Sequence, residues 1–272
     1  MYKRQGWGKC CVVGCAAIQI DISKGTITVG DETLQRGDWI SLNGSNGLVY
    51  RGELPMIDAS DDNPVLSEFL KMCDKIRRLR VRTNADTPED TRKARGFGAE
   101  GIGLFRTEHM FYGEGSEGPL FILRKVIVAK DADERRKTLA QLEKHIKKDI
   151  QSTLVAMEGY PVTIRLLDPP LHEFIPHGEK QKKELAEAVG ISVADLDRRA
   201  DSMHEVNPMM GHRGVRLGVT YPEITETQVR AIFNAAAALL KKGKKVFPEI
   251  MIPVVSHSNE LEHQMDIVRR VY

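Results

Sequence analysis

Three arginines each follow a short apolar run. They are Arg106 in GIGLFRTEHMF, Arg165 in VTIRLLDPPLHEF and Arg213 in NPMMGHRGVRLG. A guanidinium is always charged, and its planar fork of N–H groups matches phosphate or carboxylate oxygens two at a time. A single arginine more often makes an exposed salt bridge, whereas three at neighbouring strand ends suit a small anion with several charges. The sequence therefore predicts a binding site for such an anion at Arg106, Arg165 and Arg213.

Other polar residues lie near these arginines in the sequence. Asn84, in RVRTNADTP, is placed either to donate to the anion or to cap the following turn, and both roles stay open. Asp168 begins an Asp-Pro-Pro turn, in which its carboxylate is expected to pair with a neighbouring arginine and support the site. His172 and His212 are interpreted as packing or supporting residues, because none of the eight histidines has the spacing of a metal site.

The arginines require strands that end beside one another. Residues 101–105 and 162–164 are apolar runs too short for helices, and each lies between stretches of helical spacing, which predicts buried parallel strands. From residue 81 onward strand and helix patterns alternate, which is typical of an α/β fold. Strand-like units occur in RVRTNA, GIGLF, VTIRLLD, GHRGVRLG and PEIMIPVV. They predict the first five βα units of a (β/α)8 TIM-type barrel, where ligands bind at the emerging strand ends.

Helix signals mark the segments between the predicted strands. Thr87-Pro88 begins one helix, because threonine caps the first N–H groups and proline fits the first turn. Further helices are predicted around residues 133–157, within 179–204, around 223–242 and from about 259. Gly96, Gly98 and Gly101 have GxGxxG spacing, but they follow a helix and precede a strand, the reverse of a dinucleotide site. They are interpreted as a glycine-rich helix exit.

The first 78 residues have a different pattern. Between residues 10 and 52, short β-type runs alternate with turn signals such as Lys24-Gly25, and residues 63–78 have the apolar spacing of a helix. We therefore predict a β-rich domain over residues 1–52, a linker helix over 53–78 and the barrel over 79–272. Because the β-rich domain opens abruptly and a closed barrel needs three more units, the sequence is expected to be a piece of a longer protein.

The composition argues against several classes of partner and site. Forty Lys and Arg residues against 38 Asp and Glu give a formal charge of +2, without a basic stripe, so no nucleic-acid partner is expected. No apolar run approaches the roughly 18 residues of a membrane span, so no membrane association is expected. Cys10, Cys11, Cys15 and Cys73 form no zinc-binding pattern. They predict reduced core thiols and a cytoplasmic location.

Six motifs together resemble the pyruvate, phosphate dikinase family of PEP-utilising enzymes. They are GKCCVVGC, VRTNADTPEDT, GIGLFRTEHMF, IRLLDPPLHEF, NPMMGHRGVRLGVTYPEI and PEIMIP, and the resemblance spans nearly the whole sequence. It implies a reversible reaction in which ATP, phosphate and pyruvate give AMP, diphosphate and phosphoenolpyruvate (PEP). A swivelling domain would carry a phosphohistidine to a barrel site. There Arg106 and Arg165 would hold the phosphoryl and carboxylate groups, with Arg213 in the same pocket.

The resemblance also implies parts that this sequence lacks. In the family, the phosphorylated histidine and the ATP-binding region precede the matched segment, while the carboxylate ligands of the cofactor Mg²⁺ and the proton-donating cysteine would lie beyond Tyr272. No residue here is therefore assigned a catalytic or metal-binding role, and the chain alone is expected to be inactive. The implied parent is a homodimer. PEP synthase or enzyme I of the sugar phosphotransferase system, and a non-catalytic anion-binding half-barrel, stay open as alternatives.

Overall fold

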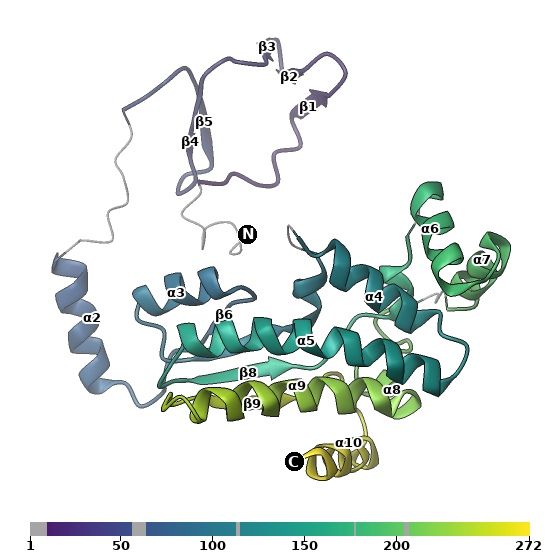
Figure 1. Ribbon diagram of the computed structural model, residues 1–272. Helices are drawn as coiled ribbons and strands as arrows, with labels where there is room; N and C mark the ends of the chain where they lie inside the picture. The colour runs from purple at the N-terminus through teal and green to yellow at the C-terminus, as the bar shows by residue number, and fades with distance from the viewer. Residues whose placement is uncertain (1–9, 56–63, 113–114, 177, 204–206) are drawn as a thin grey trace. The chain divides into compact units, whose positions relative to one another are not determined.

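The computed structural model describes residues 10–55, 64–112, 115–176, 178–203 and 207–272. The chain divides into two compact units, an N-terminal unit of residues 1–78 and a C-terminal unit of residues 79–272 (Figure 1). The described residues form three hydrogen-bonded sheets, two of them in the N-terminal unit and the third in the C-terminal unit. The three predicted site arginines all belong to the C-terminal unit.

The described part of the N-terminal unit contains short antiparallel strands and one helix. The strands are β1 (Ile18–Asp21), β2 (Thr26–Val29), β3 (Glu32–Gln35), β4 (Ile40–Asn43) and β5 (Leu48–Arg51). β1, β2 and β3 form one sheet in that order, and β4 pairs with β5. The short β-type runs that the sequence predicted between residues 10 and 52 are confirmed by these strands. The predicted helix is α2 (Pro64–Ile76).

The cysteines of this unit are not core residues, which corrects the prediction made from their apolar neighbours. All four are free thiols, but Cys10 and Cys15 are exposed, while Cys11 and Cys73 are only partly covered. The four-residue strands of this unit bury little surface, so an apolar run here does not imply a buried one. The Cys10 thiol donates to the carbonyl oxygen of Leu42 at 3.2 Å.

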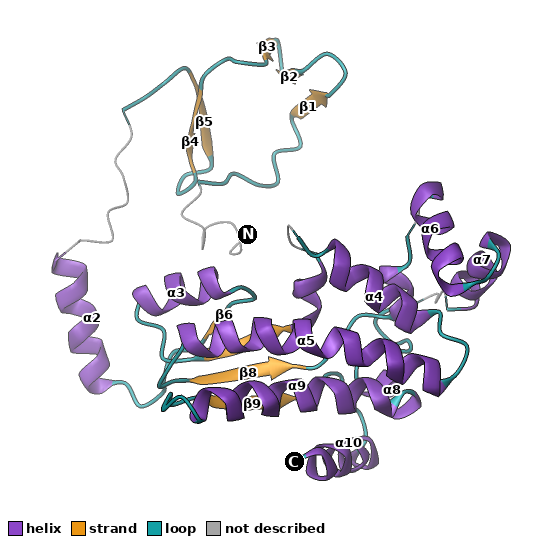
Figure 2. Cartoon of the chain, viewed as in Figure 1, coloured by secondary structure: helices purple, strands orange, loops and turns teal. Residues whose placement is uncertain are grey.

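The C-terminal unit is an α/β structure built on one parallel sheet. Its strands are β6 (Thr83–Asn84), β7 (Ile102–Arg106), β8 (Pro161–Arg165) and β9 (Phe247–Met251). They lie in the order β6-β7-β8-β9, so each strand is parallel to the one that precedes it in the chain. Such neighbours require crossover connections, which the helices supply (Figure 2).

The helices carry the chain from each strand to the next. The α-helices described in this unit are α3 (Pro88–Gly96), α4 (Glu117–Ile127), α5 (Ala132–Ala156), α6 (Glu179–Val189), α7 (Val193–Ser202), α8 (Val215–Thr220), α9 (Pro222–Leu240) and α10 (Ser258–Val271). Two short 3-10 helices are η1 (Thr107–Phe111) and η2 (Leu171–Phe174). The predicted Thr87 cap is confirmed, because its hydroxyl accepts from the Asp90 N–H at 3.0 Å. Among the described residues, no helix is both long and apolar enough to cross a membrane.

The two faces of the parallel sheet differ in character. Val162 and Ile164 of β8 are buried and join the core formed with α5 and α9, which lie side by side over the sheet in Figure 1. Thr163, which lies between Val162 and Ile164, points to the other face of the sheet. There its hydroxyl donates to Glu249 at 2.7 Å, and Arg82 donates to both Thr163 and Glu249. This alternation fixes which strand residues face the helices and which face away from them.

The fourth predicted strand, in GHRGVRLG, is wrong. Gly214 has a φ of +56°, which ends any extended run, and α8 begins at the next residue. The sheet of this unit therefore has four described strands where the sequence predicted five. Val215 and Leu217 alternate with arginines between glycines, which imitates the pattern of a strand, but residues 211–214 form a bend that leads into α8.

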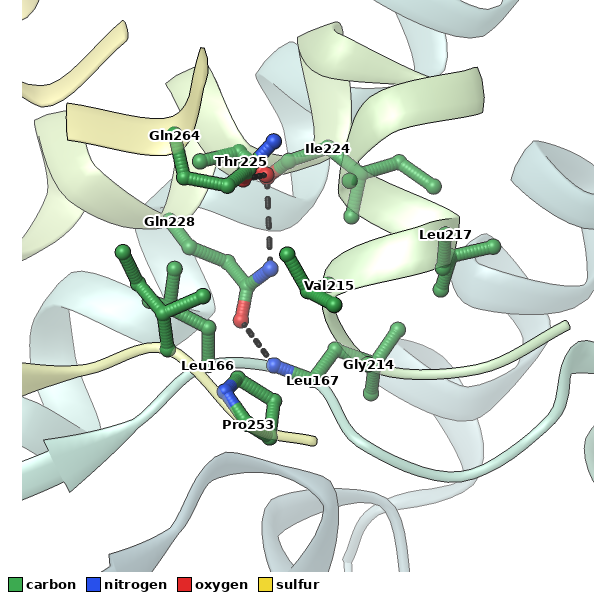
Figure 3. Close-up of a pocket in the computed structure, with 12 residues that line it drawn as sticks. Leu166, Leu167, Gly214, Val215, Leu217, Ile224, Thr225, Gln228, Pro253 and Gln264 are labelled. Atoms are coloured by element: carbon green, nitrogen blue, oxygen red, sulfur yellow. Dashed lines mark hydrogen bonds between the residues drawn. The ribbon is translucent and has the colours of Figure 1, made fainter. Parts of the chain in front are cut away.

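This bend is held against the ends of β8 and β9 (Figure 3). Gly214 donates its N–H to the carbonyl of Asp168 at 3.1 Å, and Val215 donates to the carbonyl of Pro253 at 3.0 Å. A Cβ added at Gly214 would lie 2.2 Å from Cγ2 of Val254, so only glycine fits this close approach. Val254 itself has a φ of +56°, a rare conformation for a β-branched residue. The bend thus reaches the strand ends without being a strand.

Candidate functional site

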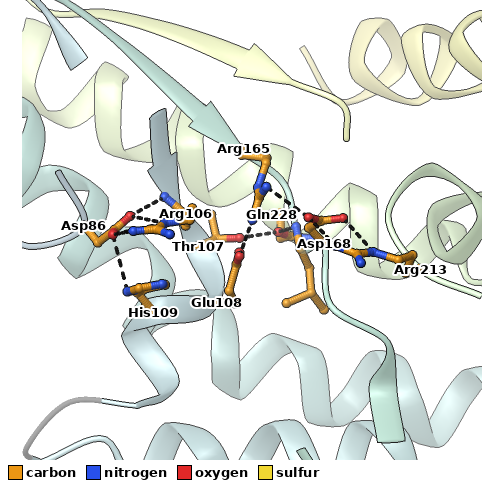
Figure 4. A network of polar contacts seen from close by, with 10 residues as sticks. Asp86, Arg106, Thr107, Glu108, His109, Arg165, Asp168, Arg213 and Gln228 are labelled. Atoms are coloured by element: carbon orange, nitrogen blue, oxygen red, sulfur yellow. Dashed lines mark hydrogen bonds and ion pairs between the residues drawn. The ribbon is translucent and has the colours of Figure 1, made fainter. Parts of the chain in front are cut away.

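The three predicted arginines come together beyond the carboxyl ends of the parallel strands (Figure 4). Arg106 is the last residue of β7 and Arg165 the last of β8, and the two are paired in register. Arg213 comes from the bend before α8 rather than from a strand end. It reaches the same place because Asp168, three residues after Arg165, pairs with both Arg165 and Arg213.

Arg106 is held by Asp86, which follows β6. The carboxylate of Asp86 accepts from the Arg106 backbone N–H at 2.9 Å, from Nε at 3.0 Å, and from Nη2. Nδ1 of His109 lies 3.4 Å from the same carboxylate. Nη1 of Arg106 makes no hydrogen bond within the described ranges, so this nitrogen is available to a ligand. Asp86 therefore fixes both the strand end and the direction of the guanidinium.

Arg165 lies between two carboxylates. Nη2 donates to Oε1 of Glu108, and Nη1 lies 3.0 Å from Oδ2 of Asp168. Both carboxylate side chains are less than a tenth exposed, whereas the Arg165 side chain is 19% exposed and so remains reachable. Within the part of the chain that the structure describes, Oε2 of Glu108 and Nε of Arg165 are buried without a hydrogen-bond partner. The Arg165 fork is thus oriented by two fixed anions.

Arg213 is fixed by a two-pronged contact with Asp168. Its Nε donates to Oδ1 at 3.2 Å and its Nη2 donates to Oδ2 at 2.7 Å. This confirms the prediction that Asp168 pairs with a neighbouring arginine, and it adds that two arginines share the carboxylate. The side chain of Arg213 is 21% exposed, and its Nη1 makes no hydrogen bond to any described residue.

The charges of this cluster balance. Arg106, Arg165 and Arg213 supply three positive groups, and Asp86, Glu108 and Asp168 supply three negative ones. Burial tends to raise the pKa of Asp86. Hydrogen bonds from Arg106, together with the electrostatic effects of His109 and Arg106, outweigh burial, so the pKa of Asp86 lies below its ordinary value. The same hydrogen bonds to Asp86 raise the pKa of Arg106. The ion pair is therefore intact throughout the neutral range.

The remaining candidates from the sequence have other surroundings. Asn84 ends β6 and is exposed, and its side chain makes no hydrogen bond to the three arginines among the described residues. Nε2 of His212 lies 2.9 Å from Oγ1 of Thr220, and its ring packs against Tyr221. His212 is therefore a packing residue, as the sequence predicted. The exposed end of Asn84 leaves both of its predicted roles open.

Sequence reasoning missed Asp86, Glu108 and Gln228. Asp86, in TNAD, follows the end of β6 by two residues, and Glu108, in RTE, follows Arg106 at the end of β7 by two residues. An acidic residue so close to a predicted strand end indicates a candidate partner for the arginines. Gln228 lies on α9, far along the chain, and accepts from the backbone N–H of Leu167 at 2.8 Å. Nothing in the local sequence of a helix indicates such a contact.

The carboxylates do not fit a metal site. Among the described residues, no group of three or more His, Cys, Asp or Glu side chains could hold a metal ion. Asp86, Glu108 and Asp168 are each occupied by an arginine, whereas Mg²⁺ prefers oxygen ligands in octahedral geometry. What the arrangement can do is bind an anion, because it presents three planar cations at one end of a sheet.

Tyr272, beyond which the resemblance places the Mg²⁺ ligands, has no part in the arginine cluster. Its side chain is 93% exposed and makes no hydrogen bond to the three arginines among the described residues. The centre of its ring lies 5.3 Å from that of Phe233 on α9, in an edge-to-face arrangement. The location of the Mg²⁺ ligands stays a prediction.

Comparison with known proteins identifies the family of the chain. The family model for the PEP-binding domain of PEP-utilising enzymes matches residues 61–272. The chain is 47% identical over 268 residues to the chloroplastic pyruvate, phosphate dikinase of Mesembryanthemum crystallinum, covering 98% of this chain and 28% of that protein. Identity to the chloroplastic pyruvate, phosphate dikinase 1 of Arabidopsis thaliana is 47% over 269 residues, with the same coverage of 98% and 28%.

A third relative is pyruvate, phosphate dikinase 2 of Zea mays, which is 45% identical over 269 residues, covering 98% of this chain and 30% of that protein. The chain therefore spans less than a third of the length of these relatives. The match of the PEP-binding domain extends from within the N-terminal unit through the whole C-terminal unit. The matched range includes Arg106, Arg165 and Arg213. The chain therefore belongs to the PEP-utilising enzyme family.

Proposed function

We propose that the chain is part of a pyruvate, phosphate dikinase and that its C-terminal unit supplies part of the site for PEP and pyruvate. The full reaction would convert ATP, pyruvate and phosphate into AMP, PEP and diphosphate through a phosphohistidine. The observation that carries this proposal is the convergence of Arg106, Arg165 and Arg213 at one end of the sheet. The relatives at 45–47% identity, all pyruvate, phosphate dikinases, support the choice of reaction.

The chemistry of PEP suits this cluster. PEP carries a phosphoryl group and a carboxylate on adjacent atoms, so it needs two anion-binding forks at a fixed separation. Arg106 and Arg165, paired in register on neighbouring strands, provide such forks. Phosphoryl transfer depends mainly on positioning and on neutralising the charge spread over the transferring oxygens. These arginines would bind and orient the substrate and stabilise that charge, while their carboxylate partners hold them in place.

The architecture supports a finer proposal about the fold. The four parallel strands in sequential order, with crossover helices, are proposed to be consecutive strands of a (β/α)8 barrel. Ligands of such barrels bind at the carboxyl ends of the strands, which is where the arginines lie. We further propose that residues 1–52 belong to a phosphohistidine domain and that residues 53–78 connect it to the barrel.

The cofactor and the remaining partners follow from the reaction rather than from residues of this chain. Mg²⁺ is proposed as the cofactor, with ligands from segments beyond Tyr272, because the carboxylates of the cluster are occupied by arginines. When bound, Mg²⁺ would neutralise charge on the phosphoryl oxygens. ATP, AMP and phosphate are proposed to bind other domains of a homodimeric parent.

A cytoplasmic location is proposed because all four cysteines are free, as thiols are in a reducing compartment. Subcellular fractionation with an antibody against the C-terminal unit tests this proposal. Recovery of the protein with cytosolic markers is expected. Recovery in plastids, as the names of two of the relatives suggest for those proteins, would contradict it.

Calorimetric titration of the chain with PEP tests the proposed function directly. Saturable binding is expected, and Arg106→Ala and Arg165→Ala are each expected to weaken it by about tenfold or more, since each removes a charge-assisted hydrogen bond. Arg82→Ala is the matched control, because Arg82 is also paired with a carboxylate, Glu249, but precedes β6. Folded protein that does not bind PEP, or equal losses in all three variants, would contradict the proposal.

A further inference from the structure

One buried side chain from α9 reaches the ends of both arginine-bearing strands. Gln228 is 5% exposed, and its Oε1 accepts from the backbone N–H of Leu167 at 2.8 Å and from Oγ1 of Thr107 at 3.3 Å. Its Nε2 donates to the carbonyl of Ile224, one helical turn earlier, at 3.3 Å. Figures 3 and 4 show this amide between the helix and the strand ends.

The two donors are directly linked to the site arginines. Thr107 immediately follows Arg106, and Leu167 lies between Arg165 and Asp168. The sheet itself does not hold Leu167, because the last bond along this edge is donated by Leu166 to the carbonyl of Met251 at 3.0 Å. Beyond that point the Leu167 N–H depends on Gln228.

The amide oxygen is well suited to this position. It has two lone pairs and here accepts from two buried donors, one from each strand end. Thr107 and Leu167 are 2% and 5% exposed, so without Gln228 neither donor could turn to bulk water. A buried donor that loses its partner keeps the full penalty of desolvation, which favours a shift of the backbone toward another acceptor. Such a shift would move the adjacent arginines.

The helix that carries Gln228 gives it a fixed base. α9 is 19 residues long, and it packs against α5 along the core. Next to Gln228 on this helix, Val229 and Ile232 have no exposed surface. The hydrogen bonds of the Gln228 amide thus anchor the residues that follow β7 and β8 to a well-packed helix.

We propose that Gln228 is a positioning residue, which ties together the segments that follow β7 and β8, at Thr107 and Leu167, and therefore helps to set the spacing of the Arg106 and Arg165 guanidinium groups. Its effect on ligand binding rests on the proposed function, because that spacing matters to PEP only if the two arginines bind PEP. Its effect on the strand ends does not depend on the ligand. The two effects can therefore be tested separately.

Three variants isolate the role of the amide. Gln228→Leu removes the acceptor and the donor at similar size, whereas Gln228→Glu keeps an acceptor oxygen for Leu167 and Thr107. Gln264→Leu is the matched control: Gln264 is 1% exposed and accepts from Oγ1 of Thr225 at 2.8 Å, but it lies on α10 and bonds neither strand end. Thermal unfolding of each variant measures how much stability is lost.

Amide hydrogen exchange in the absence of ligand is the first measurement. In Gln228→Leu, exchange of the Leu167 N–H is expected to accelerate by about tenfold or more, while exchange of the neighbouring Leu166 N–H, which the sheet holds, changes much less. Gln228→Glu and Gln264→Leu are expected to keep Leu167 protected. Unchanged exchange of Leu167 in Gln228→Leu, or equal acceleration in Gln264→Leu, would overturn the proposal whether or not PEP binds.

PEP affinity by calorimetry is the second measurement. Gln228→Leu is expected to weaken binding by about tenfold to a hundredfold, because small displacements of positioning groups have effects of this size. Gln264→Leu is expected to bind within about twofold of the original chain, even where it loses as much thermal stability. If the original chain binds no PEP, the proposed function fails, while the exchange of Leu167 still decides the role of Gln228. If Gln228→Leu binds as tightly as the original chain, the positioning role in binding is wrong.

Discussion

Asp168 binds Arg213 through both carboxylate oxygens, with Nε to Oδ1 at 3.2 Å and Nη2 to Oδ2 at 2.7 Å. The same Oδ2 lies 3.0 Å from Nη1 of Arg165. One carboxylate therefore holds together two arginines that come from parts of the chain 48 positions apart (213 − 165). Without this carboxylate, two positive groups would face each other at close range.

We expect Asp168→Asn to lower the free energy of unfolding of the C-terminal unit by about 1–3 kcal/mol, because two charged donors lose an ionised partner. Asp266→Asn, which affects an exposed pair with Arg269, is expected to change it by less than about 0.5 kcal/mol. Urea unfolding followed by circular dichroism at the helical band measures both. Tryptophan fluorescence is unsuitable, because both tryptophans, Trp7 and Trp39, precede residue 79, at which the C-terminal unit begins. Equal effects of the two substitutions would contradict the prediction.

Gly214→Ala is expected to destabilise the chain more than another glycine substitution at positive φ. A Cβ at Gly214 would lie 2.2 Å from Cγ2 of Val254, whereas a Cβ at Gly190 would meet nothing within 4 Å. Both residues have positive φ, but Gly190 lies in the left-handed helical region (φ +69°, ψ +39°), whereas Gly214 lies outside it (φ +56°, ψ −127°), where a residue with a Cβ is more strained. The overpacking should add about 1–3 kcal/mol at Gly214 only. Comparison of the two thermal unfolding midpoints tests this, and a lower midpoint for Gly190→Ala would show it wrong.

Arg106→Lys is expected to weaken PEP binding by about tenfold although the charge is kept. Arg106 donates to Asp86 through Nε and Nη2 and leaves Nη1 for the ligand. A lysine ammonium is a single point donor and cannot serve both partners in this fixed geometry. Arg230→Lys is the control, because Arg230 is half exposed and lies 3.9 Å from Glu143. Calorimetric affinities that are the same for both variants would argue against a role for the fork.

The pair of Asp86 and Arg106 predicts a pH dependence of stability. The pKa of Asp86 is below its ordinary value of 3.8 in the folded chain, so the folded state binds a proton less readily than the unfolded state. The stabilisation is therefore fully present well above pH 3.8 and is lost as pH falls below it through the folded pKa. The difference in unfolding free energy between the original chain and Asp86→Asn should be constant near neutrality and shrink in acid. A difference that grows on acidification would contradict the pairing.

The strand-end positions of Arg106 and Arg165 could be predicted from the sequence because each follows an apolar run of strand length between helices. This pattern is local and depends only on burial and periodicity. Arg213 was predicted for the wrong reason. Its segment is a bend, and its position depends on hydrogen bonds to Asp168 and Pro253, which lie 45 and 40 positions away (213 − 168 and 253 − 213). Hydrogen bonds between such distant residues produce no hydrophobic periodicity in the sequence, so the sequence pattern does not predict them.

The missed carboxylates illustrate a different limit. Asp86 and Glu108 are common residue types at loop positions, where they more often cap turns or face solvent. Their pairing with Arg106 and Arg165 depends on the neighbouring order of β6, β7 and β8, which brings separate loops to one edge. Gln228 is harder still, because a buried glutamine on an amphipathic helix looks like an irregularity of the apolar stripe until the facing strand ends are known.

The balance of charge in the cluster has a consequence for the rate of ligand capture. Three positive and three negative groups arranged as close pairs produce a field that decays faster with distance than that of three isolated cations. At physiological ionic strength, where screening acts over about 8 Å, a distant anion would feel little attraction toward the strand ends. Association should therefore depend only weakly on salt, and the favourable interaction arises after contact, when the guanidinium groups already point where the ligand arrives.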